Sequence, residues 1–413
     1  MRYGCIGETL KHSFSAEIHA LLSPESYELC EVAKGALDEF MTKRDFSGIN
    51  VTIPYKQAVI PYLYEIDGQA KAIGAVNTVV NRGGRLFGYN TDFYGMCALI
   101  RHIGADLRGK KVAILGTGGT SLTAAEVARS LGATEILRVS RSGKDGAVTY
   151  EALYQDHRDL QCIINTTPCG MYPHPEGLPV ELDRFPGLEC VADAVYNPLR
   201  TRLVAEAGKR GIPAEGGLLM LVAQAVRASE IFLDKTYPAD TVERIWKMLV
   251  RRKENIVLIG MPGSGKSTVG KLLAERLGRE FVDTDELIAS ASTRTPSEII
   301  QADGEPAFRD LETRVVRDAA MRAGVVLATG GGAVLRQENV EALRQNGRLY
   351  LLDRPWEDLV PTDDRPLSGT RELIRQRYEE RRDAYLSAAD VRIINPETPE
   401  DAANRIEKEF DTV

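Results

Sequence analysis

The chain has 413 residues, a formal net charge of −7, 43% hydrophobic residues and 27% charged residues. This length exceeds one ordinary domain, so two or three globular domains are expected, and the acidic balance argues against a general binder of nucleic acid or acidic membranes. The longest apolar stretch, around residues 218–226, is too short to span a bilayer, and no basic-then-apolar signal segment opens the chain. We therefore expect a cytoplasmic protein without a membrane partner.

Cysteines occur only in the first half of the chain, and none forms a C-x-x-C pair. Most are expected to be small buried hydrophobic side chains. Their spacing supports neither a zinc site nor a disulfide framework. The six are Cys5, Cys30, Cys97, Cys162, Cys169 and Cys190.

Polar residues gather beside turns at four places in the first hundred residues, namely 12–15, 50–56, 74–78 and 88–92. Each cluster alone is common in turns and helix caps. Four clusters together, with a lysine and an aspartate among them, fit a pocket for a polyhydroxylated ligand better.

A glycine-rich turn follows an apolar strand at residues 110–121, and an alanine-rich helix follows the turn. The spacing matches the dinucleotide pattern G-x-G-x-x-G/A, with a serine in the third small position. Backbone amides at such a helix start favour a pyrophosphate. The predicted cofactor contacts are Gly116, Gly118, Gly119, Thr120 and Ser121.

The next predicted strand, at residues 135–140, ends in Ser140, Arg141 and Ser142. An NAD-binding unit usually has Asp or Glu here, which accepts hydrogen bonds from the ribose. A guanidinium instead suits a 2′-phosphate through charge-assisted hydrogen bonds. These three residues therefore predict NADP(H) as the cofactor, while an ordinary surface arginine is the alternative.

The order of these motifs resembles shikimate dehydrogenase over about residues 1–250. Later segments at 165–171, 193–198 and 217–224 agree with that family, and the departures are Ala16 and the serines beside Arg141. The resemblance implies reduction of 3-dehydroshikimate to shikimate with NADPH. It makes Lys56 and Asp92 the catalytic pair, which suits the chemistry because an ammonium can donate a proton to a ketone oxygen. The implied substrate contacts are Ser13, Ser15, Thr52, Asn77, Tyr196 and Gln224.

An amphipathic helix is predicted at residues 241–252, followed by the charged run 251–254. We interpret this run as a solvated connector and place the main domain boundary there.

A second glycine-rich turn, at residues 260–268, follows the apolar strand 256–259 and matches G-x-x-x-x-G-K-[ST]. Its glycines allow close backbone approach to phosphate oxygens. In this pattern Lys266 reaches the β- and γ-phosphates of a nucleotide, and the Ser267 hydroxyl binds Mg²⁺. The predicted nucleotide contacts are Gly263, Ser264, Gly265, Lys266, Ser267 and Thr268.

Downstream of this turn, a predicted strand at residues 279–285 ends in two carboxylates on one face. Asp283 is expected to reach the metal through water, and Asp285 to accept a proton from an attacking hydroxyl. Three glycines follow another strand at residues 330–332. Residues 304–312, which include Arg309, open a predicted helix. Arg365 lies in a polar loop at residues 364–367, and Arg381 lies on a late predicted helix. Each of these arginines alone would be an ordinary surface side chain.

Together these motifs resemble shikimate kinase over about residues 254–413, although the segment before Arg365 is short for that family. The resemblance implies ATP and Mg²⁺ as cofactors and a catalytic role for Lys266 and Asp285. Arg365 would belong to a lid and neutralise charge on the transferred phosphoryl group. The residues implied to hold shikimate are Asp285, Arg309, Gly331, Gly332 and Arg381.

The sequence thus predicts an α/β protein with two consecutive activities. A dehydrogenase substrate domain (1–97 and 213–250) would flank a Rossmann-type NADP domain (98–212), with a P-loop kinase domain at 254–413 that has a parallel sheet. Two alternatives remain: a quinate/shikimate dehydrogenase fused to a different small-molecule kinase, or a non-catalytic sensor. The partners expected are small-molecule substrates, and the sequence does not predict the oligomeric state.

Overall fold

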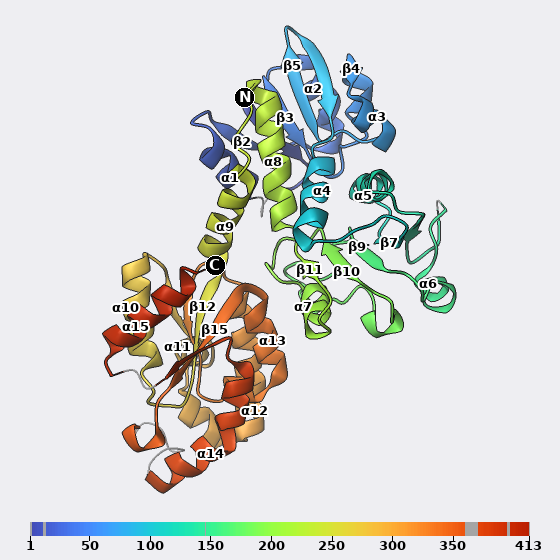
Figure 1. The fold of residues 1–413 in the computed structure, drawn as a ribbon. Helices are drawn as coiled ribbons and strands as arrows, with labels where there is room; N and C mark the ends of the chain where they lie inside the picture. The colour runs from blue at the N-terminus through green and yellow to red at the C-terminus, as the bar shows by residue number, and fades with distance from the viewer. Residues whose placement is uncertain (1, 11–13, 145, 360–370, 395–396, 413) are drawn as a thin grey trace. The chain divides into compact units, whose positions relative to one another are not determined.

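The computed structural model describes residues 2–10, 14–144, 146–359, 371–394 and 397–412 (Figure 1). Contacts divide the chain into two compact units, Met1–Trp246 and Lys247–Val413. In the described parts of the chain, no helix is long and apolar enough to cross a membrane.

The first sheet of the first unit is mixed and has the strand order β2-β1-β3-β5-β6-β4. Its strands are β1 (Tyr3–Gly7), β2 (Tyr27–Glu31), β3 (Gly48–Val51), β4 (Glu65–Ile66), β5 (Thr78–Arg82) and β6 (Arg85–Tyr89). Between them lie α1 (Ser15–Leu22), η1 (Lys34–Ala36), α2 (Leu37–Lys43), η2 (Ile60–Tyr62) and α3 (Gly68–Ile73). Because β3 and β5 are antiparallel, the end of β3 lies beside the start of β5, where Asn50 pairs with Thr78.

The second sheet of this unit is parallel throughout and has the order β11-β10-β9-β7-β8. Its strands are β7 (Lys111–Leu115), β8 (Glu135–Val139), β9 (Cys162–Asn165), β10 (Cys190–Asp193) and β11 (Ala214–Glu215). Between them lie α5 (Gly119–Ser130), α6 (Tyr150–Asp156), η3 (Leu182–Arg184) and α7 (Arg202–Lys209). Strand β8 lies on one side of β7, and β9, β10 and β11 follow on the other side. The strand order therefore reverses at β7, so a ligand crevice is expected at the carboxyl end of β7.

Alternate residues of β7 enter different hydrophobic clusters, which explains the continuous apolar run in its sequence. Val112 and Ile114 belong to one cluster, whereas Ala113 and Leu115 belong to another. Both faces of this parallel sheet are therefore covered.

Two helices of the first unit, α4 (Asp92–Ile103) and α8 (Leu218–Leu233), pack against each other (Figure 1). Gly95 of α4 permits this packing, because a Cβ there would lie only 2.5 Å from the Met220 carbonyl oxygen. Helix α4 begins with Asp92, a predicted catalytic residue, and helix α8 carries Gln224. The packing of α4 against α8 therefore determines how Asp92 and Gln224 are placed relative to each other.

The second unit contains a parallel five-stranded sheet in the order β13-β14-β12-β15-β16. Its strands are β12 (Asn255–Ile259), β13 (Phe281–Asp283), β14 (Val326–Ala328), β15 (Gly347–Asp353) and β16 (Val391–Ile394). Its other elements are α10 (Lys266–Leu277), α11 (Thr284–Ser292), α12 (Pro296–Ala320), η4 (Ala333–Leu335), α13 (Gln337–Asn346), η5 (Trp356–Asp358), α14 (Arg371–Ala388) and α15 (Pro399–Phe410). The α/β class predicted from the sequence is confirmed in both units.

Helix α12 consists of two helices that meet at Gly304, whose φ of 86° and ψ of 161° are not helical. Pro306 follows at a position where a helix tolerates a missing amide hydrogen. The sequence predicted a helix start here, and the second half of α12 begins at this point.

The charged run at residues 251–254 is exposed at Arg251 and Arg252, but it is not a separate solvated connector. Helix α9 (Thr241–Lys253) continues through most of it, and Glu254 is fully buried. The Glu254 amide donates to the Val250 carbonyl at 2.7 Å, and its carboxylate lies 3.3 Å from the Arg348 guanidinium. An ion pair with a distant arginine, which the sequence pattern does not reveal, makes this burial possible.

Candidate active sites

Lys56 and Asp92 form an ion pair in the first unit. The Nζ of Lys56 lies 2.5 Å from Oδ2 of Asp92, and the two side chains are only 14% and 10% exposed. Lys56 follows β3 in a turn, whereas Asp92 is the first residue of α4. A carboxylate is favoured at a helix N-terminus, so the start of α4 suits the Asp92 carboxylate.

A buried network of amides and hydroxyls leads to the start of α4. Asn77 Oδ1 accepts hydrogen bonds from the Thr91 amide at 2.7 Å and from Thr78 Oγ1 at 3.1 Å. Asn50 donates to Thr78 Oγ1 at 3.1 Å, and Thr91 Oγ1 lies 3.4 Å from Gln224 Oε1. Two predicted substrate contacts, Asn77 and Gln224, are thus brought together from opposite ends of the unit's sequence.

Three further predicted substrate contacts lie in the described structure. Ser15 is buried at the start of α1, and Thr52 is half-buried directly after β3. Tyr196 is half-buried after β10, with its ring centroid 5.3 Å from that of Phe14. Burial raises the pKa of Tyr196, so its hydroxyl keeps its proton and can donate a hydrogen bond. Ser13 lies outside the described residues.

The predicted dinucleotide turn runs from the end of β7 into α5. Gly116 has a φ of 110°, and a Cβ there would lie 2.8 Å from Thr166 Oγ1, so glycine is required. Gly118 caps α5, and Ser121 donates to the Gly118 carbonyl at 2.6 Å. A Cβ at Gly119 would lie 3.5 Å from Cδ of Lys56, which places the turn beside the ion pair. Thr120 is half-buried in the first turn of α5.

Ser140, Arg141 and Ser142 directly follow β8, at the same edge of the sheet as this turn. Arg141 and Ser142 are exposed, and Ser140 Oγ accepts a hydrogen bond from the Gly143 amide at 3.0 Å. Among the described residues, no carboxylate forms an ion pair with Arg141. Its guanidinium therefore remains available to an anionic ligand, and these residues fit a 2′-phosphorylated dinucleotide.

The phosphate loop of the second unit joins β12 to α10. Gly260, Gly263 and Gly265 have positive φ angles of 144°, 83° and 92°, which only glycine adopts readily. Lys266 Nζ donates to the carbonyls of Gly260 and Met261, both at 2.9 Å.

Two loop hydroxyls differ in their exposure. Ser264 is 2% exposed, and its Oγ has no hydrogen-bond partner within the part of the chain that the structure describes, whereas Thr268 is exposed in the first turn of α10. A buried polar atom without a partner is costly, so a phosphate oxygen at this loop would satisfy it. The loop fits a nucleotide phosphate.

Ser267 and Asp283 combine the oxygen atoms expected for Mg²⁺. Ser267 Oγ donates to Asp283 Oδ2 at 2.7 Å, and both side chains are half-buried. Mg²⁺ prefers a few protein oxygen ligands and completes its shell with water and phosphate, so this pair fits the ion.

The sequence predicted that Asp285 lies at the end of a strand, but in the structure Asp285 is not on the strand. Strand β13 ends at Asp283, which caps α11 by accepting a hydrogen bond from the Asp285 amide at 2.9 Å. Asp285 thus lies in the first turn of α11. Asp283 and Asp285 are spaced so that the first can cap a helix that contains the second. Because the helix begins directly after Asp283, the strand does not extend to Asp285.

The three glycines after β14 allow charged side chains to lie directly on the backbone. A Cβ at Gly330 would lie 2.7 Å from Asp285 Oδ1 and 2.9 Å from Glu312 Oε1. A Cβ at Gly332 would collide with the guanidinium of Arg309. A Cβ at Gly331 would lie 2.7 Å from Pro262 of the phosphate loop, so this segment links the loop to the predicted acceptor site.

Arg309 is held by two carboxylates on its own helix. Its Nη1 lies 2.6 Å from Glu312, and its Nη2 lies 2.9 Å from Glu305. Burial raises the pKa of Glu312, while Arg309 opposes this rise. Glu312 is 1% exposed and fixes the orientation of the arginine.

Arg381 and Tyr385 of α14 both donate to the Gly331 carbonyl, with the Arg381 hydrogen bond at 3.2 Å. Arg381 is buried, whereas the neighbouring Arg382 is exposed. Arg365 and the predicted lid lie outside the described residues.

Several residues that the structure brings into these sites were not among the predicted contacts. They are Asn50, Thr78, Thr91, Pro262, Glu312 and Tyr385. The first three lie in polar clusters that were predicted to form a pocket, and Glu312 follows Arg309 by three positions on a predicted helix. The contacts of Pro262 and Tyr385 join distant segments.

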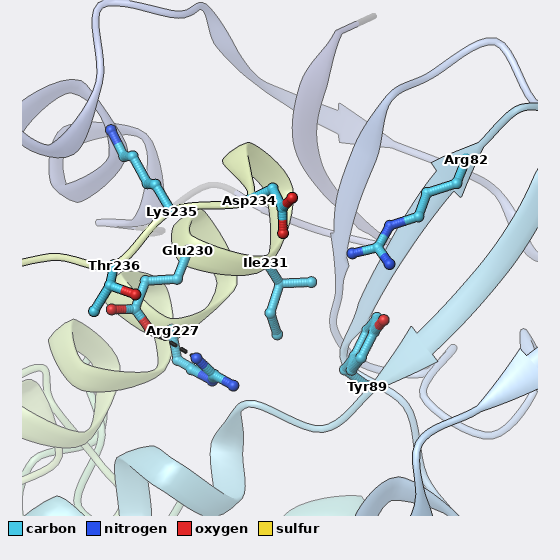
Figure 2. A pocket seen from close by; sticks show the side chains of 8 residues that line it. All are labelled: Arg82, Tyr89, Arg227, Glu230, Ile231, Asp234, Lys235 and Thr236. Carbon is cyan, nitrogen blue, oxygen red and sulfur yellow. Dashed lines mark hydrogen bonds and ion pairs between the residues drawn. The ribbon is translucent and has the colours of Figure 1, made fainter.

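A separate pocket of ≈ 330 Å³ lies near the C-terminal end of α8 (Figure 2). It is lined by Arg82, Tyr89, Arg227, Glu230, Ile231, Asp234, Lys235 and Thr236, none of which the sequence analysis selected. Arg227 and Glu230 pair at 2.9 Å, and this ion pair neutralises part of the charge that lines the pocket. This pocket is not part of either candidate active site.

Comparison with known proteins finds a different family for each part of the chain. Residues 5–79 match the family model of the shikimate dehydrogenase substrate binding domain. A shikimate dehydrogenase (NADP(+)) from Clostridium perfringens is 35% identical over 270 residues, which cover 60% of this chain and 97% of that relative. The chain belongs to the shikimate dehydrogenase family. Residues 262–411 match the family model of shikimate kinase, so the predicted fusion is confirmed.

Solved structures resemble the dehydrogenase part. A shikimate dehydrogenase from Peptoclostridium difficile has a TM-score of 0.56 and 33% identity, and the match covers 60% of this chain and 98% of that one. The shikimate 5-dehydrogenase from Thermus thermophilus, solved with NADP(H) and shikimate, has a TM-score of 0.54 and 29% identity, with 60% and 99% covered. These similarities support the Rossmann-type assignment of the second sheet.

Proposed function

We propose that the chain is a bifunctional enzyme of the shikimate pathway. The dehydrogenase part reduces 3-dehydroshikimate to shikimate with NADPH, and the kinase part transfers phosphate from ATP to shikimate. The product of the first reaction is then the acceptor of the second. The observation that carries the proposal is that each unit holds a phosphate-binding glycine turn beside its own charged cluster.

In the dehydrogenase, Lys56 donates the proton that the ketone oxygen needs as hydride reaches the carbonyl carbon. Asp92 holds the ammonium in position, at 2.5 Å. NADPH supplies the hydride. Since Gly119 lies against the Lys56 side chain, the cofactor turn and the proton donor meet at one place. Asn77 and Gln224 orient the substrate hydroxyls.

In the kinase, Asp285 accepts the proton of the attacking hydroxyl, and Lys266 stabilises charge on the phosphoryl group. Arg309 and Arg381 bind the substrate carboxylate, because both are buried around the glycine segment that touches the phosphate loop. ATP with Mg²⁺ would supply the phosphoryl group, and Ser267 and Asp283 would hold the ion.

We assign residues 1–97 and 213–250 to a substrate domain, 98–212 to an NADP domain and 254–413 to the kinase. The mixed sheet lies within residues 3–89, and four strands of the parallel sheet lie within residues 111–193. The fifth strand of the parallel sheet, β11 (Ala214–Glu215), falls just beyond the proposed boundary at residue 212. This division places Lys56 and Asp92 on the substrate side and Gly119 and Arg141 on the cofactor side.

The proposal is tested by following both reactions in one assay with 3-dehydroshikimate, NADPH and ATP·Mg²⁺. Lys56→Ala should lower reduction at least about 10²-fold and leave phosphorylation of added shikimate unchanged. Lys266→Ala should have the converse effect. NADPH consumption and ADP release are the two readouts.

Two exposed lysines serve as matched controls, Lys71 on α3 and Lys271 on α10. Their alanine variants should retain both activities. Undiminished reduction by Lys56→Ala would refute the dehydrogenase mechanism, and undiminished ADP release by Lys266→Ala would refute the kinase assignment.

A further inference from the structure

Two cysteines lie directly opposite each other at the start of neighbouring strands. Cys162 is the first residue of β9 and Cys190 the first of β10, and the two are register partners in the parallel ladder. Register partners point to the same face of a sheet. Both side chains accordingly belong to one hydrophobic cluster, with Val112 and Ile114 of β7.

A cavity of ≈ 200 Å³ reaches this pair of thiols from the surface. Its walls include Cys162, Cys190, Lys110 and Glu189, together with residues at the end of α4. Lys110 and Glu189 pair at 2.6 Å and are 30% and 54% exposed, so the wall is solvated at this side. Cys190 is 5% exposed and Cys162 is 1% exposed, which makes Cys190 the thiol that a small reagent meets first.

The spacing of parallel strands suits a bond between these thiols. Neighbouring strands lie about 4.8 Å apart, and disulfides join Cα atoms separated by about 4.4–6.8 Å. The neighbouring Cys162 thiol lowers the pKa of Cys190 with further help from Lys110, although burial and Glu189 oppose this change. The Cys190 thiol and burial raise the pKa of Cys162. Cys190 is the nucleophile and Cys162 the resolving thiol.

We propose that Cys162 and Cys190 form a modification site for small peroxides, at which the two thiols are converted to a reversible disulfide. The Cys190 sulfur attacks one peroxide oxygen, the O–O bond breaks, and hydroxide leaves and takes a proton to become water. The Cys162 sulfur then attacks the Cys190 sulfenic acid. The S–S bond forms, the S–O bond breaks, and the hydroxyl leaves with the Cys162 proton as a second water.

The site lies at the edge of the sheet opposite to the cofactor. Both cysteines are at the amino ends of their strands, whereas Gly116 follows the carboxyl end of β7. The reaction therefore needs neither NADP(H) nor substrate.

The test treats the full-length protein with limiting hydrogen peroxide, blocks the remaining thiols and digests with trypsin. Peptides 159–184 and 185–200 carry Cys162 and Cys190, respectively. Mass spectrometry should find them linked, with the loss of two hydrogen atoms, and dithiothreitol should separate them. Because Cys169 shares the first peptide, fragmentation must place the bond at Cys162.

Two serine variants distinguish the nucleophile, Cys190, from the resolving thiol, Cys162. Cys162→Ser should leave Cys190 as a sulfenic acid that dimedone traps, and Cys190→Ser should leave Cys162 as a free thiol. Cys97→Ser, which changes another buried cysteine of the same cluster, should still form the link. If peroxide oxidises the half-buried Cys30 and Cys169 without linking the two peptides, the proposal is wrong.

Discussion

At the scale of single residues, both sites depend on charges that neighbouring groups hold in fixed positions. Asp92 starts a helix and faces Lys56, and Arg309 lies between Glu305 and Glu312. Charges that are already oriented need little rearrangement as the reaction proceeds, which is how such groups stabilise a transition state. Single substitutions should therefore affect one activity and one kinetic parameter at a time.

Arg141 is expected to select the phosphorylated cofactor. Arg141→Ala should raise the KM for NADPH about 10- to 100-fold, since hydrogen bonds to a charged group contribute about 1.5–3 kcal/mol. The KM for NADH should stay nearly constant, because that cofactor lacks the 2′-phosphate. Steady-state kinetics with both cofactors provide the measurement. An equal loss with NADH would contradict a role in 2′-phosphate recognition.

Asp193 should make stability depend on pH. It is fully buried at the end of β10 and accepts hydrogen bonds from Thr201 at 2.6 Å and Asn165 at 2.8 Å. Burial raises its pKa from 3.8 to about 6, although these hydrogen bonds oppose the rise. A carboxyl with a raised pKa binds its proton more tightly in the folded state. Its stabilising contribution is present below about pH 4 and is lost as pH rises through about 6.

The difference between these two pKa values corresponds to about 3 kcal/mol. Urea unfolding of wild type and Asp193→Asn at several pH values measures it, because the amide cannot ionise. From pH 4 to pH 7 the wild type should lose stability relative to the variant, by up to about that amount. A constant difference, or a relative gain by the wild type, would show that the pKa of Asp193 is not raised.

At the scale of elements, glycines decide how closely segments approach. Gly95 brings α4 against the backbone of α8, and the glycines after β14 bring Asp285 and Arg309 onto the main chain. In each place a Cβ would occupy space that another group already fills. These positions carry no reactive atom, yet the geometry of the reactive groups depends on them.

Two helical glycines provide a matched pair of substitutions. Gly95→Ala should destabilise the dehydrogenase unit by about 1–3 kcal/mol, because the new methyl would lie 2.5 Å from the Met220 carbonyl oxygen. Gly208→Ala in α7 meets nothing within 4 Å and should stabilise by about 0.5–1 kcal/mol. Thermal unfolding of both variants tests this, and equal effects would show that α4 and α8 can move apart.

At the scale of the whole molecule, each unit has hydrophobic clusters of its own. Those of the first unit cover both faces of β7, and those of the second cover both faces of β12. Each unit also carries a separate nucleotide turn. Ligands should therefore stabilise the units separately, although the chain is continuous.

Calorimetry of the full chain should show this separation. ATP·Mg²⁺ at 100 times its Kd should stabilise the kinase unit by about 2.7 kcal/mol, and NADP(H) should do the same for the dehydrogenase unit. Lys266→Ala should remove only the ATP effect. A uniform rise of the entire unfolding profile with either ligand would instead indicate a single cooperative unit.

The sequence by itself determined the features that depend on short-range order. Both glycine turns require particular backbone angles within a few residues, so Gly116 and Gly265 were recognisable from spacing alone. The α/β class followed from apolar runs between helical segments, and the motif order indicated the family. The specific roles of the site residues stay predictions until the kinetic experiments are done.

Tertiary structure alone decided which distant residues meet. Packing of α4 on α8 brings Thr91 to Gln224, and strand register brings Cys162 to Cys190. It also buried Glu254 within the charged run at residues 251–254. The physical reason is common to all three. Their energies come from partners far away in the chain, such as Arg348 for Glu254, which no local pattern encodes.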